Sequence, residues 1–153
     1  MTIPIVIPGR ADLTICHLVL DFNGTLAQDG RVAPSTVTLL KDVAARVHTM
    51  IVTADTFGTV KPFAQALGME CHIIRGTADK RVLVESLDGA VVAIGNGAND
   101  QAMFEAANLA ICVIGTEGAH RAAINASDIV THTIDDALAL LLHPDRLVAT
   151  LRE

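Results

Sequence analysis

Short apolar stretches rich in β-branched residues recur along the chain, and segments with helical periodicity separate most of them. Apolar runs of this length, bounded by turn residues, are typical of buried strands. We predict strands over residues 14–20, 49–52, 71–74, 90–94, 109–114 and 129–131. Because strands that alternate with helices form a parallel sheet covered on both faces, the pattern predicts an α/β domain.

Helical periodicity is clearest in residues 40–47 and 60–67, which carry apolar side chains at i, i+3, i+4 and i+7. Pro34 precedes the first segment and Gly68 follows the second, as residues that begin and end helices do. Weaker patterns predict further helices over about residues 79–87, 100–107, 118–126 and 135–142. Nearly every predicted strand therefore has a helix that can cross back over the sheet.

The chain has 153 residues, a length that fits one domain. No Ser/Gly-rich linker, charge block or internal repeat divides it, so we predict a single domain over residues 1–153. Residues 26–34 can form only a small flap, and residues 53–80 hold only a helix and a strand. We therefore expect no cap domain over the sheet.

Composition and charge exclude several classes of protein. Hydrophobic residues make up 51% of the chain and charged residues 18%, so intrinsic disorder is a poor interpretation. The net charge of −6 argues against a nucleic-acid partner, which requires a basic surface. The apolar runs are far shorter than the roughly 20 residues of a membrane span, and the prolines and missing basic residues near Met1 do not fit a signal peptide. We expect a soluble, cytoplasmic protein with no membrane partner.

Cysteines and histidines show no metal-site spacing. The three cysteines are odd in number and lie in strand-like stretches, so we expect free thiols. His17 follows Cys16 and His72 follows Cys71, but neighbours in a strand point to opposite faces. We therefore expect all six histidines to be structural.

Polar side chains stand where three predicted strands end. Asp21 follows the first of them, Thr53 follows the second, and Gly95 and Asn96 follow the strand over residues 90–94. The carboxyl ends of parallel strands face the crevice in which α/β proteins bind ligands. Three loops that are distant in sequence are thus predicted to meet at one ligand.

Each polar motif also has an ordinary explanation when taken alone. Lys80 fits a solvated lysine at a helix start, and Asp100 fits an N-cap in the glycine-rich turn that begins at Gly95. That turn is not a dinucleotide fingerprint, because Asp100 replaces its third glycine. Asp21 differs, since an acid at the tip of a buried strand, followed by Gly24 in a turn, can serve as nucleophile or metal ligand.

Taken together, the order Asp21-x-x-Gly-Thr25, Thr53, Lys80 and Gly95-x-Gly-x-Asn-Asp100 resembles the four-motif signature of the haloacid dehalogenase-like (HAD) superfamily. The resemblance spans about residues 14–130. Within the superfamily the chain is most similar to the phosphorylation domain of P-type ATPases and its small soluble relatives, over residues 52–55, 95–102 and 106–111. It implies a three-layer, Rossmann-like fold with a mainly parallel sheet, and a phosphatase that acts through an aspartyl-phosphate.

The resemblance also implies roles for individual residues. Asp21 would attack phosphorus, and Lys80 would neutralise charge on the nucleophile and the phosphoryl group. Thr53 would donate its hydroxyl to a phosphoryl oxygen, and Ala54 and Asn99 would complete the phosphate-binding residues. Asp55 resembles the acid of the P-type ATPase Thr-Gly-Asp motif, with Ala54 in place of the glycine.

The metal implied by the resemblance is Mg²⁺. Asp21, the backbone carbonyl of Asn23, Asp100 and the position of Asn96 would form its site. Asn96 stands where an aspartate is usual, so the affinity for Mg²⁺ is expected to fall. Asn23 occupies the position of the general acid and base, and an amide cannot shuttle a proton at neutral pH. Turnover is therefore expected to be slow, because such help is worth about 10²–10⁴ in rate.

Two other functions are alternatives to a phosphatase. A degenerate relative that binds phosphate or a partner and regulates without turnover is favoured by Asn23 and Asn96. A receiver domain of two-component signalling does not fit, since it needs an acidic pair after its first strand, and Phe22 follows Asp21 here. The implied partner is a phosphorylated substrate. An uncapped site also favours a large substrate, or a homo-oligomer in which a second copy closes the site.

Overall fold

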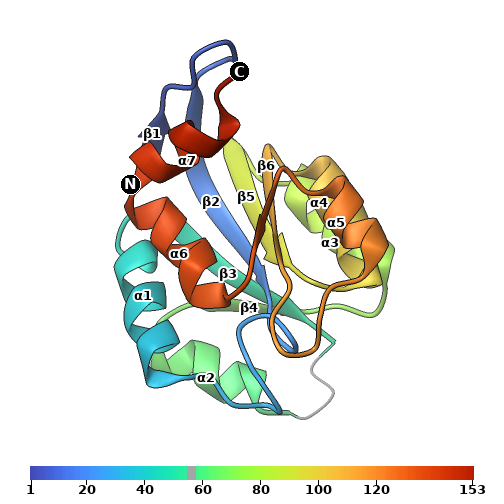
Figure 1. Cartoon of the computed structure of the whole chain (residues 1–153). Helices are drawn as coiled ribbons and strands as arrows, with labels where there is room; N and C mark the ends of the chain where they lie inside the picture. Colours follow the sequence, from blue (N-terminus) through green and yellow to red (C-terminus); the bar gives the residue numbers. More distant parts are fainter. Residues whose placement is uncertain (55–57) are drawn as a thin grey trace.

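A seven-stranded sheet forms the middle layer of the computed structural model, which describes residues 1–54 and 58–153 (Figure 1). The sheet order is β4-β3-β2-β5-β6-β7, and these strands are parallel, while β1 pairs antiparallel with β2. The strands are β1 (Ile3–Ile5), β2 (Leu13–Asp21), β3 (His48–Thr53), β4 (Glu70–Ile73), β5 (Ala90–Gly95), β6 (Leu109–Val113) and β7 (Ile129–Thr131).

Helices cover both faces of this sheet (Figure 1). One face carries α1 (Pro34–Ala44), α2 (Val60–Ala66), α6 (Ile134–Leu142) and α7 (Pro144–Leu151). The opposite face carries α3 (Thr77–Glu85), α4 (Gln101–Ala106) and α5 (Arg121–Ala126), with a 3₁₀ turn, Ala98–Asp100, before α4. The predicted three-layer α/β fold with a mainly parallel sheet is confirmed.

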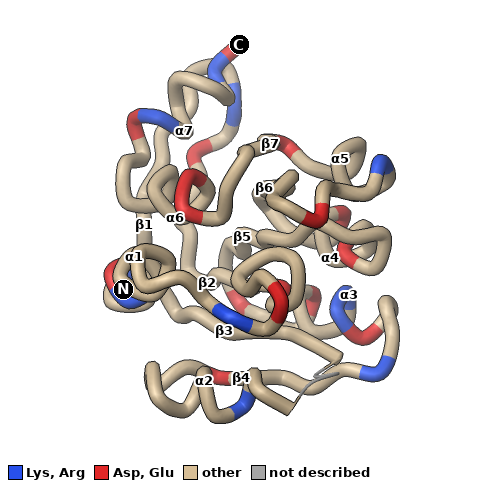
Figure 2. Tube along the Cα trace, turned by 60° about the horizontal axis from the view of Figure 1, so that its bottom comes forward, with Lys and Arg blue, Asp and Glu red and all other residues tan. Residues whose placement is uncertain are grey.

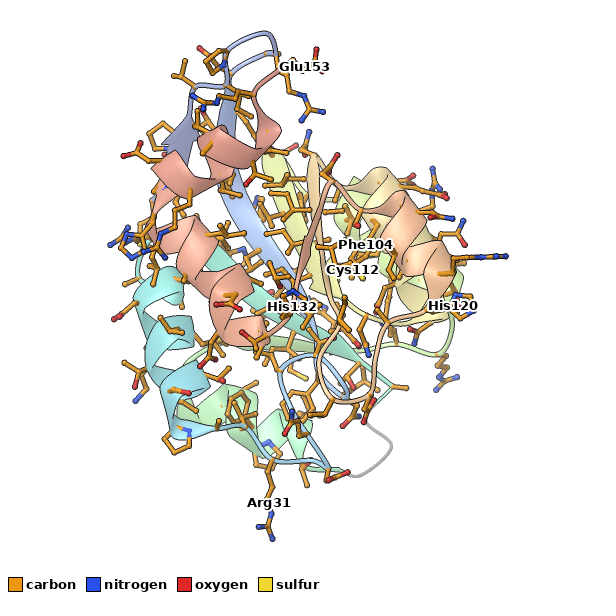
Figure 3. All side chains as sticks on the ribbon, in the orientation of Figure 1. Arg31, Phe104, Cys112, His120, His132 and Glu153 are labelled. Atoms are coloured by element: carbon orange, nitrogen blue, oxygen red, sulfur yellow. The ribbon has the colours of Figure 1, made fainter. Side chains whose placement is uncertain are left out.

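Alternation along the strands divides the core in two. In β2, Leu18 and Leu20 pack toward α1 and α6, whereas Val19 points to the other face. Phe104 and Cys112 belong to the second cluster and lie between the sheet and its covering helices (Figure 3). Burial on both faces explains why the parallel strands read as unbroken apolar runs in the sequence.

The order of the strands places the ligand crevice. From β2 the chain moves outward through β3 and β4, and α3 then returns it to β5 on the other side of β2. This reversal is a topological switch point, where ligands bind beyond the carboxyl ends of the strands. Between β2 and α1 the chain forms only a turn with two isolated bridges, Asn23 to Ala27 and Gln28 to Arg31, so the expected small flap is present.

Two elements were not predicted. In β1, Ile3 and Ile5 are buried and Pro4 between them is exposed. Proline is tolerated here because an edge strand does not need every backbone amide for hydrogen bonds to a neighbouring strand. The helix α7 begins at Pro144, whose missing amide proton costs nothing at a first helical position. Proline usually interrupts strands and helices, so the sequence pattern did not predict these two elements.

The three cysteines are free thiols, as predicted, although only Cys112 is fully buried. None of the helices in the described part of the chain combines the length and apolar character needed to cross a membrane. Lys and Arg are scattered along the trace rather than gathered in one stripe (Figure 2).

Candidate functional site

Asp21, Lys80 and Asp100 meet at the carboxyl edge of the central strands. Lys80 Nζ donates to Asp100 Oδ1 at 2.7 Å and to Asp21 Oδ1 at 3.2 Å. The side chains are 3% exposed for Lys80, 10% for Asp21 and 0% for Asp100. One ammonium thus joins two carboxylates that lie 79 positions apart in the sequence, from Asp21 to Asp100.

The turn after β5 holds the side chain of Asp100 in place. Its Oδ2 accepts hydrogen bonds from the backbone amides of Asn96 and Gly97, each at 2.9 Å. A Cβ added to Gly95 would collide with this carboxylate, so the last residue of β5 must be glycine. Asp100 precedes α4 as anticipated, but its side chain does not cap that helix; it accepts from the amides before it instead, and its Oδ1 is left to face Lys80.

A second set of contacts holds the loop after Asp21. Gly24 has a φ of +77°, and a Cβ there would collide with Oε2 of Glu117 and lie 2.9 Å from Nδ2 of Asn96. Thr25 Oγ1 lies 3.2 Å from both Asp21 Oδ2 and Asn96 Oδ1. The turn after Asp21 thus has a backbone conformation that favours glycine, and a larger residue there would also have to displace the side chains of Glu117 and Asn96.

Glu117 is a neighbour of the site that the sequence did not indicate. It lies between β6 and α5, and only the folded chain brings its carboxylate against Gly24. In the same loop, the carbonyl of Gly118 accepts a hydrogen bond from Asn96 Nδ2 at 3.2 Å. No spacing or motif in the sequence marks this loop, because its proximity depends on the pairing of β5 with β6.

Burial and charge shift the titration of the cluster. Burial raises the pKa of Asp21 to about 6, with a further contribution from the Asp100 carboxylate and an opposing one from Lys80. For Lys80, burial acts to lower the pKa, but the Asp21 and Asp100 carboxylates outweigh it and the pKa is raised. Lys80 therefore stays cationic, and two ionised carboxylates beside it leave one negative charge uncompensated.

The remaining predicted residues lie along the same edge. Thr53 is the buried last residue of β3, and Ala54 follows it, exposed. Asn23 is partly buried in the turn after β2, whereas Asn99 is exposed on the 3₁₀ turn. Asp55 lies outside the described residues.

The donor atoms at this edge are suited to a hard cation. The carboxylates of Asp21 and Asp100 and the amide oxygen of Asn96 are oxygen ligands, and the cluster carries the uncompensated negative charge. Among residues 1–54 and 58–153, no three His, Cys, Asp or Glu side chains are grouped to hold a metal by themselves. An ion here would also need backbone oxygens and water, which is the usual coordination of Mg²⁺.

A pocket of about 1000 Å³ lies beside the carboxylate cluster. Gly24 and Thr25 form the wall that the pocket shares with the site, and Val113, residues 115–116 and residues 132–135 contribute to the rest. The flap residue Arg31 also lines it, with a side chain that extends toward solvent (Figure 3). Neither Asp21 nor Lys80 lines this space, so it adjoins the cluster rather than containing it.

The sequence is similar to that of a known protein. No protein-family model matches the sequence. It is 51% identical, over 69 residues, to the uncharacterized protein MJ0073 of Methanocaldococcus jannaschii; the match covers 45% of this chain and 74% of that protein.

Solved structures resemble the whole fold. The cobalt-bound deoxy-D-mannose-octulosonate 8-phosphate phosphatase of Haemophilus influenzae superposes with a TM-score of 0.72 at 15% identity, covering 91% of this chain and 94% of that one. The corresponding Moraxella catarrhalis phosphatase, in complex with magnesium, phosphate and KDO, gives 0.71 at 17% identity, covering 90% and 94%.

A transport ATPase also matches. A zinc-transporting PIB-type ATPase in its E2.Pi state gives a TM-score of 0.64 at 22% identity, covering 78% of this chain and 20% of the ATPase. At these identities the likeness concerns the fold, and it agrees with both parts of the sequence resemblance. By sequence the chain belongs to the family of MJ0073, and its fold is that of the haloacid dehalogenase-like proteins that it resembles.

Proposed function

We propose that this protein is a Mg²⁺-dependent phosphohydrolase that works through an aspartyl-phosphate on Asp21. The observation that carries the proposal is the buried cluster in which Lys80 bridges Asp21 and Asp100 at the switch point of the sheet. The similar folds of two sugar-phosphate phosphatases and an ATPase domain support it. Residues 1–153 would act as one domain in the cytoplasm.

In the first step a carboxylate oxygen of Asp21 attacks phosphorus, and the bond from phosphorus to the leaving-group oxygen breaks. Lys80 neutralises the negative charge on the carboxylate and on the phosphoryl oxygens, because its pKa is raised and it stays protonated. Thr53, Ala54 and Asn99 would hold the phosphoryl oxygens. In the second step water attacks phosphorus, which releases phosphate and restores the carboxylate.

Mg²⁺ would be held by the Asp21 carboxylate, the Asn23 carbonyl and Asp100, with Asn96 beside them. Bound there, the ion supplies positive charge against the phosphoryl group. The chain itself keeps Asp100 in place through the amides of Asn96 and Gly97. The amide of Asn96 replaces a charged ligand, so binding is expected to be weak in the absence of phosphate.

The site has no general acid or base at the position of Asn23. Asn23 cannot protonate a leaving group or activate water, so substrates with good leaving groups are expected to react fastest. The phosphorylated form should also break down slowly, but it should still turn over. A large substrate, or closure of the site by a second copy of the chain, would compensate for the missing cap.

Hydrolysis of p-nitrophenyl phosphate tests the proposal. The wild-type chain should release p-nitrophenol with Mg²⁺, and both EDTA and Asp21→Asn should abolish the release. Asp42→Asn, on the exposed surface of α1, is the matched control and should keep full activity. An Asp21→Asn protein that still hydrolyses the ester would refute the mechanism.

A regulatory module is the second candidate, favoured by the amides at Asn23 and Asn96. Acid quenching after incubation with ³²P-labelled acetyl phosphate separates the two. Label that appears on Asp21 and then leaves within minutes supports the hydrolase. Label that stays for hours supports a phosphorylated switch, and a chain that takes up no label acts by binding alone.

A further inference from the structure

Two histidines face each other on the amino-terminal side of the carboxylate cluster. His17 in β2 and His48 in β3 are partners in the parallel register, and their Nδ1 atoms lie 3.1 Å apart. The rings meet edge to face, at an interplanar angle of 73°. His48 is the first residue of β3 and His17 lies midway along β2, whereas Asp21 and Thr53 are the last residues of the same two strands.

The other ring nitrogens determine where the protons are. His17 Nε2 lies 2.7 Å from the backbone carbonyl of Asp88, and His48 Nε2 lies 2.9 Å from Oε1 of Glu70. A carbonyl and a carboxylate only accept hydrogen bonds, so both Nε2 atoms must carry hydrogen. In neutral rings both Nδ1 atoms are then bare, and two lone pairs face each other across 3.1 Å.

That contact is favourable only when a cation joins the two nitrogens. We propose that His17 and His48 form a binding site for a transition-metal ion of the class that imidazole prefers, such as Zn²⁺, with water completing its coordination. A spacing of 3.1 Å fits two nitrogens that each lie about 2.0–2.1 Å from one zinc ion. The occupant that competes for this place is a single proton.

The surroundings favour a metal over a proton. A metal-bound histidine typically donates its second ring hydrogen to a carbonyl or a carboxylate, and here one ring does each. Glu70 supplies a carboxylate beside the pair, with Oε1 2.9 Å from His48 Nε2 and Oε2 3.1 Å from His72 Nε2. The His48 side chain is 44% exposed, so an ion and its waters have access from solvent.

This site is separate from the proposed magnesium site in place and in chemistry. Its ligands are nitrogens, which Mg²⁺ disfavours, whereas the carboxylate cluster offers oxygens. The neighbouring thiol takes no part, since Cys16 Sγ donates to the carbonyl of Thr14. Strand neighbours such as Cys16 and His17 do point apart, as expected from the sequence; the pair forms across strands instead.

Calorimetric titration of the EDTA-treated full chain with Zn²⁺, in buffer that contains excess Mg²⁺ to occupy the oxygen site, tests the inference. We expect one zinc ion per chain, and at least tenfold weaker binding in both His17→Gln and His48→Gln. His132→Gln changes an exposed histidine just after β7, the edge strand farthest from β3 and β4; it is the control and should bind as the wild type does. Where the pair holds a proton, zinc should release it, which titrations in two buffers of different ionisation enthalpy measure.

Histidine ¹⁵N spectra of the unaltered chain make the test independent of variant folding. Zinc should move the Nδ1 resonances of two histidines and leave their Nε2 atoms protonated. The inference is wrong if millimolar Zn²⁺ leaves those resonances in place, since the pair then holds only a proton. It is equally wrong if both glutamine variants bind zinc like the wild type. Neither result depends on phosphatase activity.

Discussion

The charged and titratable groups along β2 and β3 are buried at the carboxyl end and lie near the surface toward the amino end. At the carboxyl end, Asp21 and Asp100 are almost fully buried and share one lysine. At the amino end, His17 and His48 lie near the surface, and Glu70 is half exposed beside them. Burial makes the first cluster costly to disturb and strongly shifted in pKa, whereas water screens the second. The difference predicts where substitutions should act most.

Lys80→Met should have the largest effect. It leaves two carboxylates buried without their cation, which typically costs about 3–5 kcal/mol of unfolding free energy. Phosphatase activity should fall at least a hundredfold, because the phosphoryl charge loses its partner. Urea denaturation and p-nitrophenyl phosphate assays measure both effects. Lys41→Met, on the exposed face of α1, is the control; equal stability of the two variants would contradict the buried cluster.

The second-largest effect is expected in the pH dependence of the unfolding free energy, to which the buried Asp21 should contribute. Because the folded pKa of Asp21 is raised from 3.8 to about 6, its contribution to the stability of the metal-free protein is full below pH 4 and is lost as pH rises through 6. The shift corresponds to about 3 kcal/mol. Asp21→Asn should remove this slope in urea denaturation at a series of pH values. A wild-type slope that persists in the variant would assign it to other groups.

Gly95→Ala probes the geometry without removing a charge. The added Cβ collides with the Asp100 carboxylate, so we expect a loss of about 1–3 kcal/mol and a weaker response to Mg²⁺. Gly76→Ala is the matched control, because a Cβ there meets no atom within 4 Å. Thermal denaturation with and without Mg²⁺ measures both. Identical curves for the two variants would show that Asp100 is free to move.

The smallest effect is expected at the amino end. Glu70→Gln removes the charge of a half-exposed side chain, so stability should change by less than about 1 kcal/mol and hydrolysis should be unaffected. The zinc affinity proposed for the histidine pair should nevertheless fall about tenfold or more, because Glu70 orients His48. A large loss of activity in this variant would break the separation between the two ends.

Much of the carboxyl end could be predicted from the sequence. Asp21, Lys80 and Asp100 stand at strand ends or helix starts, and the alternation of elements brings such positions to one edge. The contact of Glu117 with Gly24 could not be predicted, because it depends on loop packing. The pairing of His17 with His48 depends on strand register, which neither strand's own pattern reveals.

The hydroxyl of Thr25 has a consequence for communication within the molecule. It carries one hydrogen but faces two acceptors, Asp21 Oδ2 and Asn96 Oδ1, at equal distance. Chemistry that engages Oδ2 of Asp21 therefore releases this hydrogen to Asn96, whose amide already holds the carbonyl of Gly118. Under the proposed mechanism, rotation of the Thr25 hydroxyl would therefore link phosphorylation of Asp21 to the loop that bears Glu117.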